Sequence, residues 1–173
     1  MNNAVATNLI RFVVILAIQG FVLTRISVDL LGSFYFQILL YPLFIMLLPF
    51  RTPRAFQLVL AFCMGIAVDA FYGSPGVHAS ASVFIAFIRP FILNAIAPRD
   101  GYDINYSPTM KRYSFAWFLR YSSIMMALHL FFYFSVEAFT FAYIVDIVLK
   151  TVCSFISSMI FILTVMFILN PED

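Results

Sequence analysis

Charged residues are scarce in this 173-residue chain, since Asp, Glu, Lys and Arg together make up only 10% of it. Soluble domains carry about 25% charged residues and are about 45–50% apolar, whereas 64% of this chain is hydrophobic and 22 residues are phenylalanine. That much apolar surface is too large for the core of one soluble domain of ordinary size. We therefore expect an all-α integral membrane protein, with the bilayer as its main solvent.

Cysteine and histidine are also scarce, with two of each. Cys63 and Cys153 both lie inside apolar runs, at a spacing that fits neither a metal site nor a disulfide framework. No second His or Cys lies near His78 at the spacing of metal ligands. We interpret both cysteines as small packing residues, and we expect neither a metal nor a cofactor.

The usual motifs of enzymes are missing as well. The chain has no GxSxG, no HExxH and no phosphate-binding loop. Asp69 and His78 resemble part of a catalytic dyad, but no nucleophile completes it. A net charge of only +2 gives no overall field for nucleic acid. We expect a protein that is not an enzyme and that does not bind nucleic acid.

What the chain does have is long apolar segments, and six of them reach the 20 or so residues of a membrane-spanning helix. Their approximate ranges are 6–25, 32–50, 55–73, 77–96, 115–136 and 140–169. The connections are too short to fold separately, so we expect one polytopic membrane domain over residues 1–173. The final run, 138–169, exceeds the bilayer thickness as one helix, so it either tilts strongly or begins at the interface.

The positive-inside rule gives these spans a direction. With the N-terminus in the cytoplasm, only Arg25 lies on the outer side, and seven basic residues lie on or near the inner side: Arg11, Arg51, Arg54, Arg99, Lys111, Arg112 and Arg120. Six spans would return the chain to its starting side. We therefore expect both termini to be cytoplasmic.

Segment 55–73 carries small and acidic residues on one face. Ala61, Gly65, Asp69 and Gly73 recur every four residues, which places them on one stripe of a helix. Small residues at this spacing let a second helix approach closely. Asp69 would cost a few kcal/mol if it faced lipid, so we expect it to face the bundle or water. It would act there as a hydrogen-bonding group at the helix end, or as a contact to a partner or ligand.

A tight turn, "GSPG", follows this stripe and precedes His78. Pro fixes φ and Gly tolerates positive φ, so Gly73 and Gly76 suit a sharp reversal. His78, Ser82 and Arg89 then share one face of the next helix. A single histidine near a membrane surface is usually an interfacial or capping residue, and we give His78 that interpretation.

Three further charged residues lie within the apolar segments. Arg89, Asp146 and Lys150 fall at related depths if each is counted from the outer end of its helix. Asp146 and Lys150 are also an i, i+4 pair. We predict a buried polar cluster of Arg89 and Asp146, joined by Lys150; the alternative is that the two cations extend separately to opposite interfaces.

The longest inner connection, 97–114, mixes basic and aromatic residues. Its members are Arg99, Tyr102, Tyr106, Lys111, Arg112 and Tyr113. Arg and Tyr are enriched at interface hot spots, which suggests a cytoplasmic docking surface. An anchor on anionic lipid headgroups, with aromatic side chains at the interface, explains the same residues equally well.

Residues 41–93 resemble the family of the rod shape-determining protein MreD, most closely in "LPFRTPR" and "GIAVDAFYGSPGVHASA". Members of that family carry a small-residue helix that ends in Asp, then a Gly-containing turn, then "G-x-H-A" at the start of the next helix. The matching positions are Gly65, Asp69, Gly73, Gly76, His78 and Ala79. Residues 115–169 resemble the family only as hydrophobic helices.

The resemblance implies a multi-pass protein of the bacterial inner membrane that belongs to the cell-elongation machinery. Proteins of this family associate with MreC, a single-span periplasmic protein. Through MreC they join the MreB filament, the glycosyltransferase RodA and a class B penicillin-binding protein. The implied role is to scaffold lateral peptidoglycan synthesis, with the 65–78 motif near the docking side of a periplasmic partner.

The same family is also similar in fold to the substrate-binding subunits of energy-coupling-factor vitamin transporters. That similarity leaves a second hypothesis open, a membrane subunit of a transporter that binds a small molecule or a lipid. Such a subunit needs a deep cavity that opens to the outer side. The expected outer connections, about 25–31, 74–76 and 137–139, are very short and offer little to close over a ligand.

Overall fold

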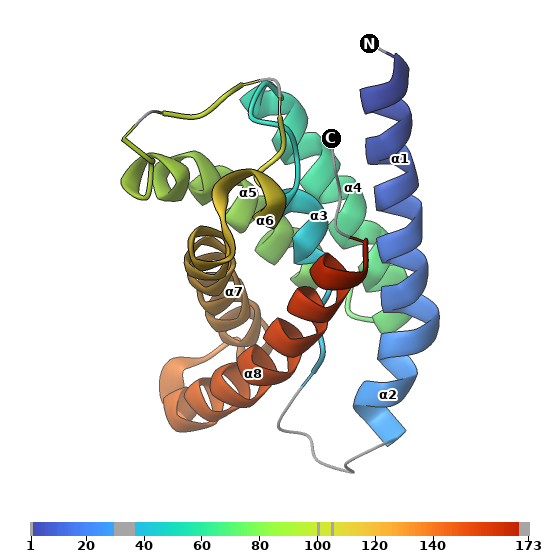
Figure 1. The fold of residues 1–173 in the computed structure, drawn as a ribbon. Helices are drawn as coiled ribbons and strands as arrows, with labels where there is room; N and C mark the ends of the chain where they lie inside the picture. Colours follow the sequence, from blue (N-terminus) through green and yellow to red (C-terminus); the bar gives the residue numbers. More distant parts are fainter. Residues whose placement is uncertain (1, 30–36, 100, 105, 170–173) are drawn as a thin grey trace.

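The computed structural model describes residues 2–29, 37–99, 101–104 and 106–169, and every regular element in these residues is a helix (Figure 1). Five helices of the described chain are long and apolar enough to cross a membrane, by length and composition: Ala6–Ile26, Arg54–Tyr72, Val77–Ala95, Phe115–Ala138 and Ile144–Ile168. The expectation of an all-helical, multi-pass chain is therefore met, with one predicted span missing from this set.

The helices follow the predicted segments to within a few residues, apart from segment 32–50. In chain order they are α1 (Asn2–Ala17), the π-helix η1 (Ile18–Leu23), α2 (Thr24–Asp29), α3 (Pro42–Met46), α4 (Arg54–Tyr72), α5 (Val77–Ala95), α6 (Met110–Tyr113), α7 (Phe115–Ala138), the 3-10 turn η2 (Phe141–Tyr143) and α8 (Ile144–Leu169). The final apolar run is thus a short turn followed by one unbroken helix.

The prediction of a spanning helix over 32–50 was wrong in the part that the structure describes, which starts at residue 37. Residues 37–40 have no regular structure, and α3 is only five residues long. Pro42 lacks an N–H and therefore starts the helix, and Pro49 disfavours helix in the residue before it. The segment is nonetheless almost entirely buried, and Figure 1 shows α3 at the centre of the bundle.

Side chains of α8 supply the hydrogen bonds that this non-helical segment cannot make with itself. The N–H of Gln37 donates to Oγ of Ser154 over 2.9 Å, and the N–H of Leu39 donates to Oγ of Ser158 over 2.9 Å. The two serines are four residues apart and so lie on one face of α8. Since an unpaired backbone group inside a bilayer costs several kcal/mol, these serines let extended backbone exist at the centre of the bundle.

Gln19, in the π-helix, holds the other side of the same segment. Its Oε1 accepts from the N–H of Leu40 at 2.6 Å and of Tyr41 at 3.2 Å. Its Nε2 donates to the carbonyl of Ile38 at 3.0 Å and to the hydroxyl of Tyr72 at 2.7 Å. π-Helical turns occur often at functional positions, and this one carries the side chain that joins the first span to the central segment and to α4.

The α4–α5 hairpin is the closest helix pair around the small-residue stripe. A Cβ added at Gly65 would lie 2.3 Å from Cα and 2.7 Å from N of Ala79. These distances are too short for any real contact, and both atoms belong to the backbone. Gly65 therefore sets the separation of the two helices, which confirms the close approach predicted from the stripe.

Replacing Gly65 with alanine should lower the free energy of unfolding by about 3 kcal/mol, the upper part of the range for overpacked cores. Gly20→Ala is the matched control, since its Cβ would meet only the ring of Phe71, at 2.8 Å. That ring is 39% exposed and is able to turn aside, so we expect a change within about 1 kcal/mol. Thermal unfolding in mild detergent measures both, and equal losses would contradict this account of Gly65.

Candidate functional site

Asp69, in the last turn of α4, ties the hairpin together. Its Oδ2 accepts the N–H groups of Gly76 at 2.9 Å and Ala79 at 3.1 Å. Its Oδ1 accepts the N–H of His78 at 2.9 Å and the hydroxyl of Ser74 at 3.3 Å. A carboxylate at a helix N-terminus satisfies N–H groups that have no partner within the helix and favours its dipole. Asp69 therefore faces the bundle, as predicted, and acts as the N-terminal cap of α5.

His78 adds a fifth hydrogen bond to the same carboxylate. Its Nδ1 lies 2.9 Å from Oδ1 of Asp69, and its side chain is fully buried. Its ring packs against the rings of Tyr41, Tyr72 and Tyr133, with centroid distances of 5.6, 4.7 and 4.7 Å. His78 was predicted to be an interfacial or capping residue; the structure buries its imidazole and places it on the carboxylate that caps α5.

A second buried histidine, His129 of α7, lies on the other side of Tyr41. The distance from its Nε2 to the Tyr41 hydroxyl is 2.7 Å. Sequence reasoning missed His129 and Tyr41, together with Gln19. The available signal was a polar side chain within a long apolar run, which indicates a residue that faces the bundle interior.

Arg89 of α5 is buried, as predicted, but among neutral acceptors. Its Nε donates to the Tyr121 hydroxyl at 3.1 Å and its Nη1 to Oε1 of Gln57 at 3.2 Å. Its Nη2 donates to the carbonyls of Met46 and Leu48. Met46 is the last residue of α3 and Leu48 lies two residues beyond it, so the guanidinium lies at the C-terminal end of this helix, where a cation is favoured by the helix dipole. Arg89 thus caps the short central helix.

The predicted cluster of Arg89, Asp146 and Lys150 was wrong. Lys150 pairs with Glu137 over 3.4 Å at the α7–α8 connection, and Asp146 is exposed. Counting depth along helices assumed that only other side chains could neutralise Arg89. The non-helical backbone after α3 provides carbonyl oxygens instead, so no carboxylate is required at that point.

The 97–114 connection folds against the turn before α4. The N–H of Phe50 donates to the carbonyl of Tyr106 at 3.2 Å, and the ring of Phe50 stacks on Tyr102 at 4.5 Å. The Tyr102 hydroxyl donates to the carbonyl of Leu93 at 2.8 Å, and burial raises its pKa to about 12. Its role is therefore structural, and it stays protonated at neutral pH.

The basic residues of the same connection reach the surface. Arg99, Lys111 and Arg112 are exposed, and the guanidinium of Arg112 lies 3.4 Å from the ring centroid of Tyr106. Of the residues predicted for a docking surface, the three tyrosines are thus half-buried and the three cations are accessible.

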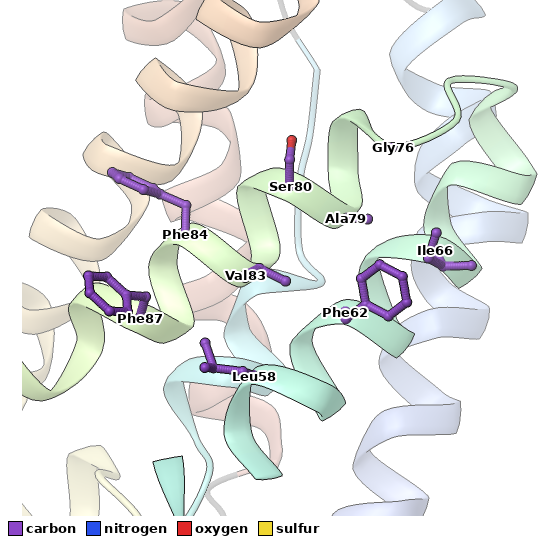
Figure 2. Close-up of a pocket in the computed structure, with 9 residues that line it drawn as sticks. All are labelled: Leu58, Phe62, Ile66, Gly76, Ala79, Ser80, Val83, Phe84 and Phe87. Atoms are coloured by element: carbon purple, nitrogen blue, oxygen red, sulfur yellow. The ribbon is translucent and has the colours of Figure 1, made fainter. Parts of the chain in front are cut away.

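The outer face of the α4–α5 hairpin carries a hollow of about 550 Å³ (Figure 2). Nearly all of its wall is apolar, and its lining residues are Leu58, Phe62, Ile66, Gly76, Ala79, Ser80, Val83, Phe84 and Phe87. Figure 2 shows Phe62 and Ile66 of α4 across from Ala79 and Val83 of α5. Such a wall accepts hydrocarbon or apolar side chains, and the hydroxyl of Ser80 donates to the carbonyl of Val77 at 2.8 Å.

Within the residues that the structure describes, no group of three or more His, Cys, Asp or Glu side chains could hold a metal ion. Comparison with protein-family models, curated proteins and solved structures finds no match to this chain. The hairpin and its neighbouring polar contacts are therefore interpreted from their geometry.

Proposed function

We propose that this chain is a membrane scaffold subunit that acts by binding a partner membrane protein through the outer face of the α4–α5 hairpin. One observation supports this function above others. The Asp69 carboxylate makes all of its hydrogen bonds within the hairpin, whereas the surface that the hairpin presents outward is an apolar hollow.

Asp69 has little capacity left for a substrate or ligand. A carboxylate offers about four lone-pair sites, and this one accepts five hydrogen bonds from its own hairpin. Three of the five donors are backbone N–H groups that would lose their partner if a ligand displaced them. The motif therefore rigidifies the hairpin, as a structural element does.

The hollow suits a transmembrane helix. Gly76, Ala79 and Ser80 are small lining residues, and small residues let helix backbones approach closely in lipid. Association within a bilayer depends on such packing because lipid tails are as apolar as Leu. A single-span partner would place side chains between Phe62 of α4 and Val83 of α5.

The resemblance to MreD proteins indicates which kind of protein this partner would be. We infer an MreC-like single-span periplasmic protein, which would connect the chain to the MreB filament, RodA and a class B penicillin-binding protein during lateral wall synthesis. This assignment includes the inner membrane as location, both termini in the cytoplasm, and the basic 97–114 connection on the cytoplasmic side.

Purification of the tagged chain in mild detergent from bacterial membranes tests the proposal. We expect a single-span protein with a periplasmic domain to be recovered in constant ratio. Recovery of ATPase subunits, or of a stoichiometric vitamin, would instead establish the transporter hypothesis and overturn the scaffold.

The docking face is tested by filling the hollow. Val83→Phe should lower partner recovery about tenfold, which corresponds to ~1.4 kcal/mol of binding free energy. Val59→Phe is the matched control, because Val59 is 55% exposed on α4 and does not line the hollow. If both variants retain the partner equally, the hollow is not the docking face.

A further inference from the structure

A second hollow lies between α1, α3 and α4, away from the α4–α5 face. It has a volume of about 310 Å³. Phe12 of α1, Phe44 of α3, and Leu60 and Cys63 of α4 form part of its apolar wall. Phe12 and Phe44 meet edge to face at 5.2 Å and so fix one side of it. We call it the α1–α4 slot.

The slot is long and narrow. Its lining extends from Thr52, just before α4, to Cys63, nine residues beyond the first residue of α4. Nine residues of helix rise about 14 Å. One turn of α-helix, about 10 Å across and 5.4 Å high, occupies about 420 Å³, which is more than the whole slot. The slot therefore has room for less than one full turn of helix, whereas an acyl chain can lie along its length.

Basic residues flank the end of the slot that lies next to the start of α4. Thr52 lines this end, between the exposed Arg51 and Arg54, and Asn8 of α1 is a second polar lining residue. Arg11 follows Asn8 by three residues on α1, which places it on the same face of that helix. Residues 6–16 and 44–63, which frame the slot, contain three arginines and no Asp or Glu.

The N-terminus of α4 adds to this positive end. α4 begins at Arg54, and its first turn contains no acidic residue. The first N–H groups of a helix have no partner within it and favour an anion. No charged residue lines either hollow, and the slot is distinguished by Arg51 and Arg54, which flank its lining residue Thr52 in the chain.

We propose that the α1–α4 slot binds an anionic phospholipid. One acyl chain lies along Phe12, Leu60 and Cys63, and the headgroup phosphate lies at Asn8 and Thr52 beside Arg51 and Arg54. The N–H of Arg51 donates to the carbonyl of Ile104 at 3.0 Å, so this headgroup site adjoins the 97–114 connection. The lipid would therefore support the contact between that connection and the start of α4. This proposal does not depend on the scaffold function.

The full chain carries its own reporter, since Cys63 and Cys153 are both free, exposed thiols. Cys63 lines the slot, and Cys153 lies on α8. The test uses nanodiscs of phosphatidylcholine with about 30% phosphatidylglycerol, an anionic lipid like those of cytoplasmic leaflets. In these nanodiscs, N-phenylmaleimide should modify Cys63 about tenfold more slowly than in nanodiscs of pure phosphatidylcholine. The rate at Cys153 should not change. Equal rates at Cys63 in both lipids, or equal slowing of both thiols, would overturn the proposal.

Two variants separate the headgroup from the acyl chain. Arg51→Gln with Arg54→Gln should reduce the phosphatidylglycerol retained in native mass spectrometry about tenfold, whereas Arg99→Gln with Arg120→Gln, at exposed positions outside the slot, should retain it. Leu60→Trp, which fills the slot, should reduce retention as well. Unchanged retention in either slot variant, or equal retention of phosphatidylcholine by the unmodified chain, would show ordinary boundary lipid and reject a specific site.

Discussion

Replacing Asp69 with asparagine should lower the free energy of unfolding by about 3 kcal/mol or more, because it removes the charged acceptor of several buried hydrogen bonds, each worth about 1.5–3 kcal/mol. Asparagine keeps the shape of the side chain but turns one oxygen into an NH₂ donor. That donor would face N–H groups of Gly76 and Ala79, or of His78, which are themselves donors. Whichever way the amide is oriented, at least one backbone N–H at the start of α5 would lose its acceptor, so the cap would be incomplete.

Two further variants, for which we expect smaller losses of stability, serve as comparisons. Ser74→Ala removes a single 3.3 Å contact to Asp69 and should cost about 1 kcal/mol or less. Asp146→Asn changes an exposed carboxylate in the first turn of α8 and should cost about 1 kcal/mol or less, through the helix dipole alone. Thermal unfolding in detergent, followed by size-exclusion chromatography, measures all three. If Asp69→Asn melts with the unmodified protein, the carboxylate does not hold the hairpin.

Arg89→Met should lower the free energy of unfolding by about 3 kcal/mol or more, about as much as Asp69→Asn does. The substitution leaves several buried acceptors without the donor that Arg89 provides. The carbonyls of Met46 and Leu48 would lose their cation, and Gln57 would lose the donor to its Oε1. The end of α3 should loosen as a result. Trypsin should then cleave at Arg51 and Arg54 faster than in the unmodified protein, even below the melting temperature.

Arg89→Lys distinguishes charge from geometry. An ammonium group is a point charge and cannot serve the carbonyls, Gln57 and Tyr121 at once, as the planar guanidinium does. We expect it to restore only part of the stability. Arg120→Met, at an exposed position on α7, is the matched control and should leave melting and trypsin cleavage unchanged. Full stability in Arg89→Lys would mean that the guanidinium geometry is irrelevant.

Much of the helical framework was predictable because apolar length and turn residues mark it directly. The bounds of α4 and α5 follow from the apolar runs and from the "GSPG" turn, and the stripe through Gly65 predicted a close helix contact that the backbone of Ala79 confirms. These features are local in sequence, so composition and period are enough to find them.

Segment 32–50 and the partners of Arg89 could not be found in the same way. Hydropathy reports that a segment is apolar, and residues 38–48 are apolar because the bundle buries them, whatever their backbone conformation. The acceptors of Arg89 at Met46 and Leu48 are main-chain carbonyls, which have no signature in the sequence. The role of Ser154 likewise depends on an extended segment over a hundred residues earlier in the chain.

The central segment also determines when the bundle can be completed during synthesis and membrane insertion. Gln37 and Leu39 leave the ribosome long before α8, yet their N–H groups are satisfied by Ser154 and Ser158 of that last helix. Until α8 enters the membrane, these groups can be paired only with water or with transient partners. The core of the bundle is therefore completed only after α8 has been made, and a chain truncated before residue 154 would contain its first spans without a finished centre.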